Sequence, residues 1–450
     1  IAGAFYEPNK VNPSNPCQSC QIGKSLDSWS ALDSANGANC DAGKVCQSGV
    51  CASACYIESR FYSPDENDNA SPCGRCIPSK KTDGWSLRNE CFKSIALGEN
   101  HSCALVDTAT VWCWGRNHLR QLGDEAGLDS TKPVRVVNSV RSTAIAAGSA
   151  HTCAIRDQLV FCWGGNSSGQ IGNGTLSESQ SLPLRVLDIA RASAVATGNL
   201  HSCALDAVGA VRCWGDNQSG QLGSGSSDLN SARPMAVVGV DGSNDESTAT
   251  AIAAGGAHSC ALMLGGSVMC WGKNNAGQLG NGTNQDQRSP VAVSNLTDAV
   301  AIATGYAHSC AVLTGGGVKC WGSNTSGELG DGRTSSSNVP VQIGASYIDN
   351  ATSITAGQNF TCVRLKTGAL KCWGNDGSDQ LGNGAGGGNA QPTPVAVLNV
   401  STAIVVGAGA SHACAGLAGG GLQCWGDNAY GQLGDGSKND RDEPTSVLGF

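Results

Sequence analysis

The sequence is dominated by one pattern, His-x-Cys-Ala followed by Cys-Trp-Gly, which recurs seven times with its framework nearly intact. Its first cysteine lies at Cys103, Cys153, Cys203, Cys260, Cys310, Cys362 and Cys414, in steps of 50, 50, 57, 50, 52 and 52 residues. A period of this length is typical of a repeat architecture in which each copy forms one supersecondary unit. The chain must therefore fold as an array of similar units.

Each copy contains four short apolar segments separated by glycine-rich turns. In the second copy these are AIAAG at 144–148, HTCAI at 151–155, a segment ending in Cys-Trp-Gly at 162–164, and a last segment with Pro183 and Val186. Four strands per repeat and many tight turns are typical of propeller blades, and the chain has 62 glycines. We predict an all-β fold in which residues 92–450 form a seven-bladed β-propeller.

The spacing within the pattern predicts a disulfide in each central hairpin. If Leu105 faces Val111 across a turn at Thr108, the same register places Cys103 opposite Cys113 on one face of the hairpin. Directly opposed cysteines on neighbouring strands can form a disulfide. The predicted pairs are Cys103 with Cys113, Cys153 with Cys162, Cys203 with Cys213, Cys260 with Cys270, Cys310 with Cys320, Cys362 with Cys372, and Cys414 with Cys424.

The same register places a tryptophan opposite a small residue on the other face of each hairpin. The tryptophans are Trp114, Trp163, Trp214, Trp271, Trp321, Trp373 and Trp425, and the residues opposite them are Ser102, Thr152, Ser202, Ser259, Ser309, Thr361 and Ala413. A bulky indole over a small neighbour suits a blade whose two faces are both buried. We predict that these tryptophans form the core between blades.

The pattern GxxHxCALxxxGxVxCWGxNxxGQLGxG resembles the regulator of chromosome condensation repeat family over residues 92–450. The resemblance implies a seven-bladed propeller, and the paired cysteines look like those of secreted bacterial members. We further expect the two ends of this segment, Ser94–Gly98 and PTSVLGF at 444–450, to share one blade. Family functions range from nucleotide exchange on a nuclear GTPase to light reception and β-lactamase inhibition, so the motif does not select a function.

Residues 1–91 have a different organisation. FYEPNKVNPSNPCQSC at 5–20 matches FYSPDENDNASPCGRC at 61–76, which indicates two cysteine-rich modules, 1–54 and 55–91. They resemble tandem cysteine-rich modules of secreted bacterial proteins. The chain has 23 cysteines, an odd number, and we expect its first module to be truncated at its start. So many cysteines favour an oxidising compartment, and hence a secreted or cell-surface protein, over zinc sites at the two Cys-x-x-Cys pairs.

Composition and motifs exclude several function classes. A formal net charge of −8 without a cluster of Lys and Arg argues against nucleic acid, and no apolar run is long enough to span a membrane. The histidine that opens each pattern is replaced by Phe360 in the sixth copy, which indicates a packing role. We predict no enzyme, no catalytic residue, no metal and no cofactor, with a calcium loop at Asp65, Asn67 and Asn69 as the alternative.

Differences between copies mark the candidate binding loops. Arg120 and Asp379 replace a glycine of the other copies, and the longest interval contains Asp241, Asp245 and Glu246 in an acidic segment. Such loops either bind a partner or vary neutrally. We predict a non-enzymatic extracellular protein that recognises a protein or glycan on a cell surface through these loops. The alternatives are a structural subunit that binds copies of itself through the cysteine-rich modules, and a secreted enzyme inhibitor or enzyme.

Overall fold

The computed structural model describes residues 92–450 apart from residues 345–346, and within residues 1–91 only short strands. These strands are β1 (Val11–Asn12), β2 (Asn15–Ser19), β3 (Ser30–Ala31), β4 (Val45–Gln47), β5 (Val50–Ala52), β6 (Cys55–Ile57), β7 (Arg60–Tyr62), β8 (Gly74–Arg75) and β9 (Ser86–Leu87). The predicted modules 1–54 and 55–91 and the alternative calcium loop otherwise lie outside the described residues.

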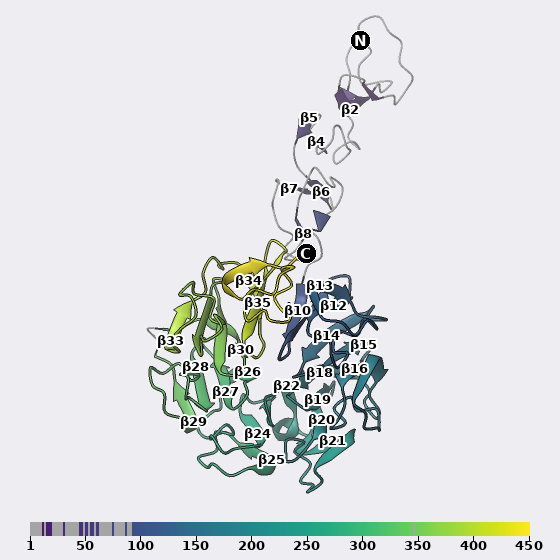
Figure 1. Ribbon diagram of the computed structural model, residues 1–450. Coiled ribbons are helices and arrows are strands. Elements are labelled where there is room, and N and C mark those ends of the chain that lie inside the picture. The colour runs from purple at the N-terminus through teal and green to yellow at the C-terminus, as the bar shows by residue number, and fades with distance from the viewer. Residues whose placement is uncertain are drawn as a thin grey trace, which may run out of the picture. The chain divides into compact units, whose positions relative to one another are not determined.

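From Phe92 onward the chain forms seven four-stranded antiparallel sheets, each made of strands consecutive in sequence and arranged as blades around a central axis (Figure 1). Blade 1 comprises β10 (Phe92–Leu97), β11 (His101–Val106), β12 (Val111–Gly115) and β13 (Ser130–Arg135). Blade 2 comprises β14 (Ser142–Ala147), β15 (His151–Arg156), β16 (Leu159–Gly165) and β17 (Ser179–Arg185). Blade 3 comprises β18 (Ala192–Thr197), β19 (His201–Asp206), β20 (Ala210–Asp216) and β21 (Asn230–Asp241).

The remaining blades repeat this order. Blade 4 comprises β22 (Ala249–Ala254), β23 (His258–Met263), β24 (Val268–Gly272) and β25 (Gln287–Ala292). Blade 5 comprises β26 (Ala299–Thr304), β27 (His308–Leu313), β28 (Val318–Gly322) and β29 (Ser337–Gln342). Blade 6 comprises β30 (Ala351–Ala356), β31 (Phe360–Leu365), β32 (Leu370–Gly374) and β33 (Gln391–Ala396). Blade 7 comprises β34 (Ala403–Ala408), β35 (His412–Leu417), β36 (Leu422–Gly426) and β37 (Arg441–Ser446).

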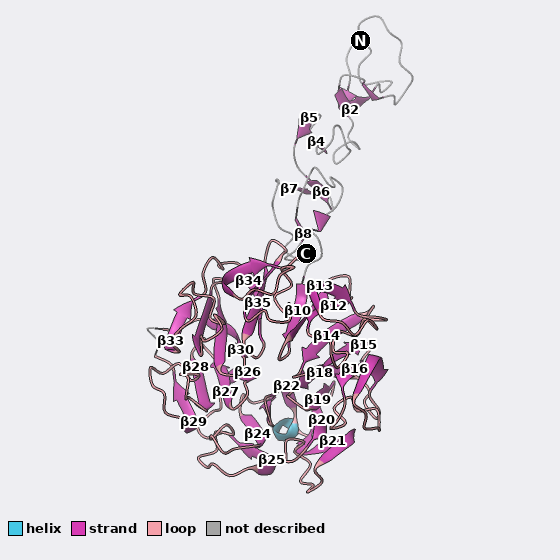
Figure 2. Cartoon of the chain, viewed as in Figure 1, coloured by secondary structure: helices cyan, strands magenta, loops and turns pink. Residues whose placement is uncertain are grey.

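The all-β, seven-bladed prediction is therefore confirmed. The described residues contain one helical turn, η1 (Asp245–Ser247), in the connection between blades 3 and 4, which is cyan in Figure 2.

The central hairpins have the predicted register and carry the predicted disulfides. Cys103 lies opposite Cys113, and in the second copy Cys153 lies opposite Cys162 because the turn is one residue shorter. A disulfide joins the pair in every blade, with Cα atoms 4.0 to 4.1 Å apart. Each bond closes a short loop within one hairpin, so it stabilises single blades and leaves the contacts between blades to other residues.

The hydrophobic core lies between neighbouring blades. Every residue of the second strand β11 is buried, since this strand is covered on both faces, whereas the outer strand β13 is partly exposed. Each cluster joins two blades: Leu105 and Val111 of blade 1 pack with Trp163 of blade 2. All seven predicted tryptophans are at most 1% exposed. Each indole thus anchors its blade against the preceding one.

The prediction that the two ends of the propeller share one blade is wrong. Strand β10 pairs with β11 in blade 1, and β37 pairs with β36 in blade 7, so no strand is exchanged. The physical reason is that residues 92–450 already contain seven complete four-strand units. Blades 1 and 7 meet by packing, with the ring of Phe450 edge-on to Phe92 at a centroid distance of 5.0 Å.

Candidate functional site

Each blade has two ends at which the chain turns differently. One end carries the turn between the first and second strands, residues 98–100 in blade 1, and the long loop between the third and fourth strands, residues 116–129. We call this end of the ring the loop face. The other end, the opposite face, carries the turn at 107–110 and the connection to the next blade at 136–141.

The predicted binding residues do not form one surface. Arg120 and Asp379 belong to loops of the loop face, in blades 1 and 6. Asp241, Asp245 and Glu246 lie in the connection between blades 3 and 4, on the opposite face, where β21 ends beside the start of β20. Sequence variation alone could not distinguish the two faces, because both consist of exposed turns.

Arg120 and Asp379 occupy positions of left-handed backbone, with φ of 67° and 63°. The other five copies have glycine there because the outer strand of the next blade approaches closely. A Cβ at Gly277, for example, would lie 2.5 Å from Cα of Asn338. The guanidinium of Arg120 donates to the carbonyl of Glu125 in its own loop, and Asp379 accepts a hydrogen bond from the amide of Gly387. Their assignment to binding stays a prediction.

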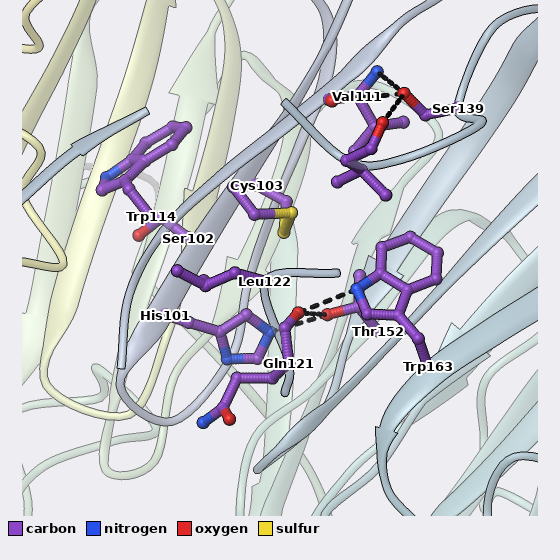
Figure 3. Close-up of a disulfide and its surroundings, with 12 residues drawn as sticks. His101, Ser102, Cys103, Val111, Trp114, Gln121, Leu122, Ser139, Thr152 and Trp163 are labelled. Carbon is purple, nitrogen blue, oxygen red and sulfur yellow. Dashed lines mark hydrogen bonds between the residues drawn. A yellow bond between two sulfur atoms is a disulfide. The ribbon is translucent and has the colours of Figure 1, made fainter. Parts of the chain in front are cut away.

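The repeated histidine joins each blade to the next through a buried hydrogen-bond network, shown for blades 1 and 2 in Figure 3. Nε2 of His101 lies 2.9 Å from the hydroxyl of Thr152, and that hydroxyl donates to the main-chain carbonyl of Gln121 at 3.0 Å. The indole Nε1 of Trp163 donates to the same carbonyl at 2.9 Å. Since the single hydroxyl proton goes to the carbonyl, His101 must be the donor to Thr152.

The same contact closes the ring at the junction of blades 7 and 1, where Nε2 of His412 lies 2.8 Å from the hydroxyl of Ser102. The other histidine pairs are His151 with Ser202, His201 with Ser259, His258 with Ser309, and His308 with Thr361. Blades are therefore joined by hydrogen bonds as well as by apolar packing. The sequence argument had assigned this position to packing and the Ser or Thr to small size alone.

Burial keeps these histidines neutral. All six are fully buried, and burial lowers the pKa of His101, His151, His258 and His412 to about 3 and that of His201 and His308 to about 4. Their Nδ1 atoms have no hydrogen-bond partner. A neutral imidazole with its proton on Nε2 satisfies the hydroxyl and leaves only an acceptor unpaired, so proton transfer chemistry is disfavoured at this position.

The two exceptions to this network face one another. Phe360 takes the histidine position in blade 6, and Ala413 takes the hydroxyl position in blade 7, which is the position that a histidine at 360 would contact. Both are fully buried. Donor and acceptor are thus absent from the same junction, so no buried polar group is left unpaired. A sequence signal existed: the two irregular residues occur in consecutive copies, at the positions that pair across blades.

The Gln-Leu-Gly segment of each loop also has a structural role. The leucine or isoleucine is fully buried, and the side chain of Gln121 accepts a hydrogen bond from the amide of Leu119. The glycine after it, Gly123, has φ of +64°, and a Cβ there would lie 2.7 Å from the indole of Trp163 in the next blade. The shared residues of the motif therefore build the ring, and recognition must depend on residues that vary.

A cavity lies at the mouth of the central channel on the loop face. Its volume is about 400 Å³, and all seven blades contribute the last residue of the first strand and the glycine that follows. The rim consists of the next residue of each turn, which differs from blade to blade: Glu99, Ser149, Asn199, Gly256, Tyr306, Gln358 and Ala410. Equivalent turns thus present seven different residues, six with a side chain and one glycine, around one opening.

A second cavity of about 290 Å³ opens beside the first, over blade 4. Its existence follows from side-chain size: blade 4 contributes Gly256 and Ala257 to its turn, whereas blade 3 contributes Asn199 and Leu200 on one side and blade 5 contributes Tyr306 on the other. Asp216, Lys273, Asn275, Ala276, Gln278, Ala307 and Ser323 complete the lining. The candidate site is this hollow together with the channel mouth.

Three exposed leucines extend this face outward. Leu128, Leu229 and Leu176 belong to the loops of blades 1, 3 and 2, and their exposed fractions of 74%, 63% and 57% are the largest of the large apolar side chains in the described part of the chain. The loops of blades 4 to 7 have no leucine at the corresponding place. Large exposed apolar side chains on one face are candidates for contact with another molecule.

Within residues 92–450 as described, no group of three His, Cys, Asp or Glu side chains is placed to hold a metal ion. No helix in the described part of the chain is long and apolar enough to cross a bilayer.

Fold and site together define a repeat propeller in which shared residues build a closed ring and varied residues line one face. A model of the RCC1-like domain matches residues 184–450, and models of the regulator of chromosome condensation (RCC1) repeat match 92–121, 143–170, 109–155 and 157–205. The chain belongs to the RCC1-like family, as its motif had indicated.

Its curated relatives are much longer proteins. Human E3 ubiquitin-protein ligase HERC2 is 29% identical over 248 residues, which are 54% of this chain and 5% of HERC2. Human probable E3 ubiquitin-protein ligase HERC3 is 33% identical over 247 residues, or 55% of this chain and 18% of HERC3. The chain therefore matches less than a fifth of the length of these relatives.

Solved structures share the fold. Human WBSCR16 superimposes with a TM-score of 0.68 at 22% identity, covering 75% of this chain and 94% of the other. Yeast RCC1 (Prp20), solved with Kap60, gives a TM-score of 0.64 at 21% identity and covers 82% and 89%.

Proposed function

We propose that this chain is a secreted or cell-surface recognition protein without catalytic activity, which binds a partner protein through the loop face. The observation that carries the proposal is the arc of exposed leucines, Leu128, Leu176 and Leu229, on three consecutive blades of that face. Burying such side chains against a partner gains roughly 25 cal/mol for each Å² of apolar surface removed from water. The similar yeast propeller, which was solved in a complex with Kap60, supports protein binding.

The extracellular location rests on a different observation, the seven disulfides of the ring. Reducing cytosol does not sustain structural disulfides in most organisms. A rigid ring with one disulfide in each blade suits a protein that must keep its binding face intact outside the cell.

Binding of the fluorescently labelled chain to the surface of its source cells tests the proposal. The triple variant Leu128→Ser, Leu176→Ser, Leu229→Ser should lose most of its binding because it removes the apolar contact and leaves the core unchanged. The matched control is Val140→Ser, Val208→Ser, Leu264→Ser, three exposed apolar residues of the opposite face. Equal binding of both variants, or loss only in the control, would overturn the proposal.

A further inference from the structure

The hollow over blade 4 has polar groups that the protein itself does not use. Among the described residues, the ammonium of Lys273, the phenol of Tyr306 and the side chain of Asn199 have no hydrogen-bond partner, although all three line the cavity. One carboxylate oxygen of Asp216 accepts from the side chain of Gln221, and the other is free. Residues with available donors and acceptors thus line an open space.

Comparable side chains elsewhere on the loop face engage one another. At the junction of blades 7 and 1 the guanidinium of Arg116 stacks on the ring of Tyr430, 4.5 Å from its centroid. At the same junction both oxygens of Asp427 accept hydrogen bonds, from the amide of Ala429 and the side chain of Gln432. The available groups over blade 4 thus differ from their counterparts at the junction of blades 7 and 1.

Tyr306 forms one wall of the hollow. A Cβ at Gly256 would lie 2.9 Å from Cδ2 of Tyr306, so the tyrosine lies against the bare turn of blade 4. Tyr306 is 45% exposed and borders both cavities. Leu200, 39% exposed, lies on the facing wall. A ligand in the hollow would contact an aromatic surface on one side and an aliphatic one on the other.

The charges of the hollow balance and suit a ligand without net charge. It has one carboxylate, Asp216, and one ammonium, Lys273, which form no ion pair with each other within the described residues. Because the two charges are opposite in sign, neither an anion nor a cation gains a net attraction from the pair. A neutral molecule with adjacent groups that both donate and accept hydrogen bonds can pair with Asp216 and Lys273. The same molecule can also pair with the side-chain amides of Asn199 and Asn275.

We propose that the hollow over blade 4 is a binding subsite for a neutral sugar residue. Vicinal hydroxyls of a pyranose donate to Asp216 and accept from Lys273 and Asn199, while the apolar C–H face of the ring packs on Tyr306. The volume of about 290 Å³ accommodates one such ring with neighbouring residues in the channel mouth. This subsite goes beyond the protein contact at the leucine arc, and either can fail without the other.

Saturation-transfer difference NMR with the full chain tests the subsite. The probes are the neutral tetrasaccharides of cellulose, chitin, mannan, xylan and maltose, with sialyllactose as an anionic probe and the peptide N-acetyl-Leu-Gln-Gly-amide as a protein-like one. We expect transfer to at least one neutral tetrasaccharide and none to sialyllactose. Absence of transfer to every neutral sugar, or transfer to the peptide alone, contradicts the proposal.

Variants at the walls show whether the bound sugar occupies this hollow. Tyr306→Ala should weaken sugar binding at least about tenfold, which is about 1.4 kcal/mol. Tyr306→Phe keeps the aromatic ring, so its affinity should stay within about threefold of the parent's. Lys273→Met should also weaken binding. Tyr430→Ala, an aromatic of the same face already covered by Arg116, is the matched control and should bind as the parent does. Unchanged binding by Tyr306→Ala would place the sugar elsewhere and overturn the assignment.

Discussion

At the scale of single residues, the junction between blades 6 and 7 shows what the repeated histidine does. Six junctions use an imidazole and a hydroxyl, and the seventh uses Phe360 and Ala413, which need no partner. An unpaired buried donor or acceptor costs more than a missing hydrogen bond, so the two positions are constrained as a pair.

This coupling predicts a non-additive double substitution. Phe360→His alone should lower the free energy of unfolding by about 1–3 kcal/mol, because its Nε2–H would face the methyl group of Ala413. Adding Ala413→Ser should recover much of that loss, since the new hydroxyl can accept from the imidazole and donate to the carbonyl of Gln380, which already accepts from Trp425. Denaturant unfolding of the two single variants and the double variant measures the coupling. Effects that add within about 0.5 kcal/mol would contradict it.

The buried histidines also predict a pH dependence of stability. Their pKa values in the folded protein, about 3 to 4, lie below the ordinary 6.5, so the unfolded chain binds more protons in the window between. Stability should therefore fall as pH drops below 6.5, by up to about 1.4 kcal/mol per pH unit for each histidine.

The Phe360 and Ala413 pair between blades 6 and 7 suggests the variant for this test, because it replaces a histidine and its hydroxyl partner together. His258→Phe combined with Ser309→Ala should reduce the proton uptake on unfolding near pH 5 by about one proton. His118→Gln, at a more exposed histidine of the loop face whose pKa is also lowered, chiefly by partial burial, should reduce the slope by less than the paired variant does. Denaturant midpoints across this pH range give the slopes. An equal slope in the paired variant and the parent would show that the histidines titrate normally.

At the scale of elements, the loop between the third and fourth strands connects the motif to the ring. Its buried leucine, its carbonyl at Gln121 and its glycine at Gly123 all contact the next blade. The loop is therefore part of the core at its base and part of the surface only at its tip. This division explains why the GQLG letters repeat while the residues around them differ.

Two glycines of one loop separate backbone strain from packing. Gly280 and Gly282 both have left-handed φ, +66° and +82°, but a Cβ at Gly280 would lie 2.8 Å from the indole of Trp321, whereas a Cβ at Gly282 meets nothing nearer than Ser294 Oγ at 4.0 Å. Gly282→Ala should cost roughly 1–2 kcal/mol. Gly280→Ala should lose a further roughly 1–3 kcal/mol through the clash.

Thermal and denaturant unfolding of the two alanine variants measure the difference. Equal destabilisation would mean that the loop does not pack on the neighbouring tryptophan as described.

The sequence was sufficient to predict the strand register within each hairpin. It was insufficient to predict the contacts between neighbouring blades. Spacing alone placed Cys103 opposite Cys113 and Trp114 opposite Ser102, because antiparallel register is local. It could not show that Thr152 receives a hydrogen bond from His101 of the preceding blade, since that contact depends on how blades stack. For the same reason it did not show that the small residues in the turn of blade 4 leave a hollow between the turns of blades 3 and 5.

At the scale of the whole molecule, the ring closes without exchanging a strand. The junction of blades 7 and 1 combines the His412–Ser102 contact with an aromatic cluster around Phe450. The centroid of the Phe450 ring lies 5.0 Å from that of Phe92 and 6.0 Å from that of Trp114. The expectation of a shared blade rested on the need to hold the ends together. Side-chain packing and a hydrogen bond meet that need here.

Phe450 should therefore contribute more to the free energy of unfolding than its neighbours in the chain do. Phe450→Ala should lower the unfolding free energy by about 2–4 kcal/mol, somewhat less than a fully buried phenylalanine, because its ring is partly exposed. Leu448→Ala, at a residue that is 42% exposed, should change it by about 0.5 kcal/mol. Proteolysis of the native chain at blades 1 and 7 is a second readout, and it should increase only in Phe450→Ala.

The central claim is that recognition takes place on the loop face, and lysine-directed cross-linking of the native protein on its source cells tests it most directly. Lys132, Lys273 and Lys438 lie toward the loop face, and Lys366 lies in a turn of the opposite face. Mass spectrometry of the linked peptides should show partner peptides joined mainly to the first three. Links concentrated on Lys366, or found only between copies of this chain, would contradict the account.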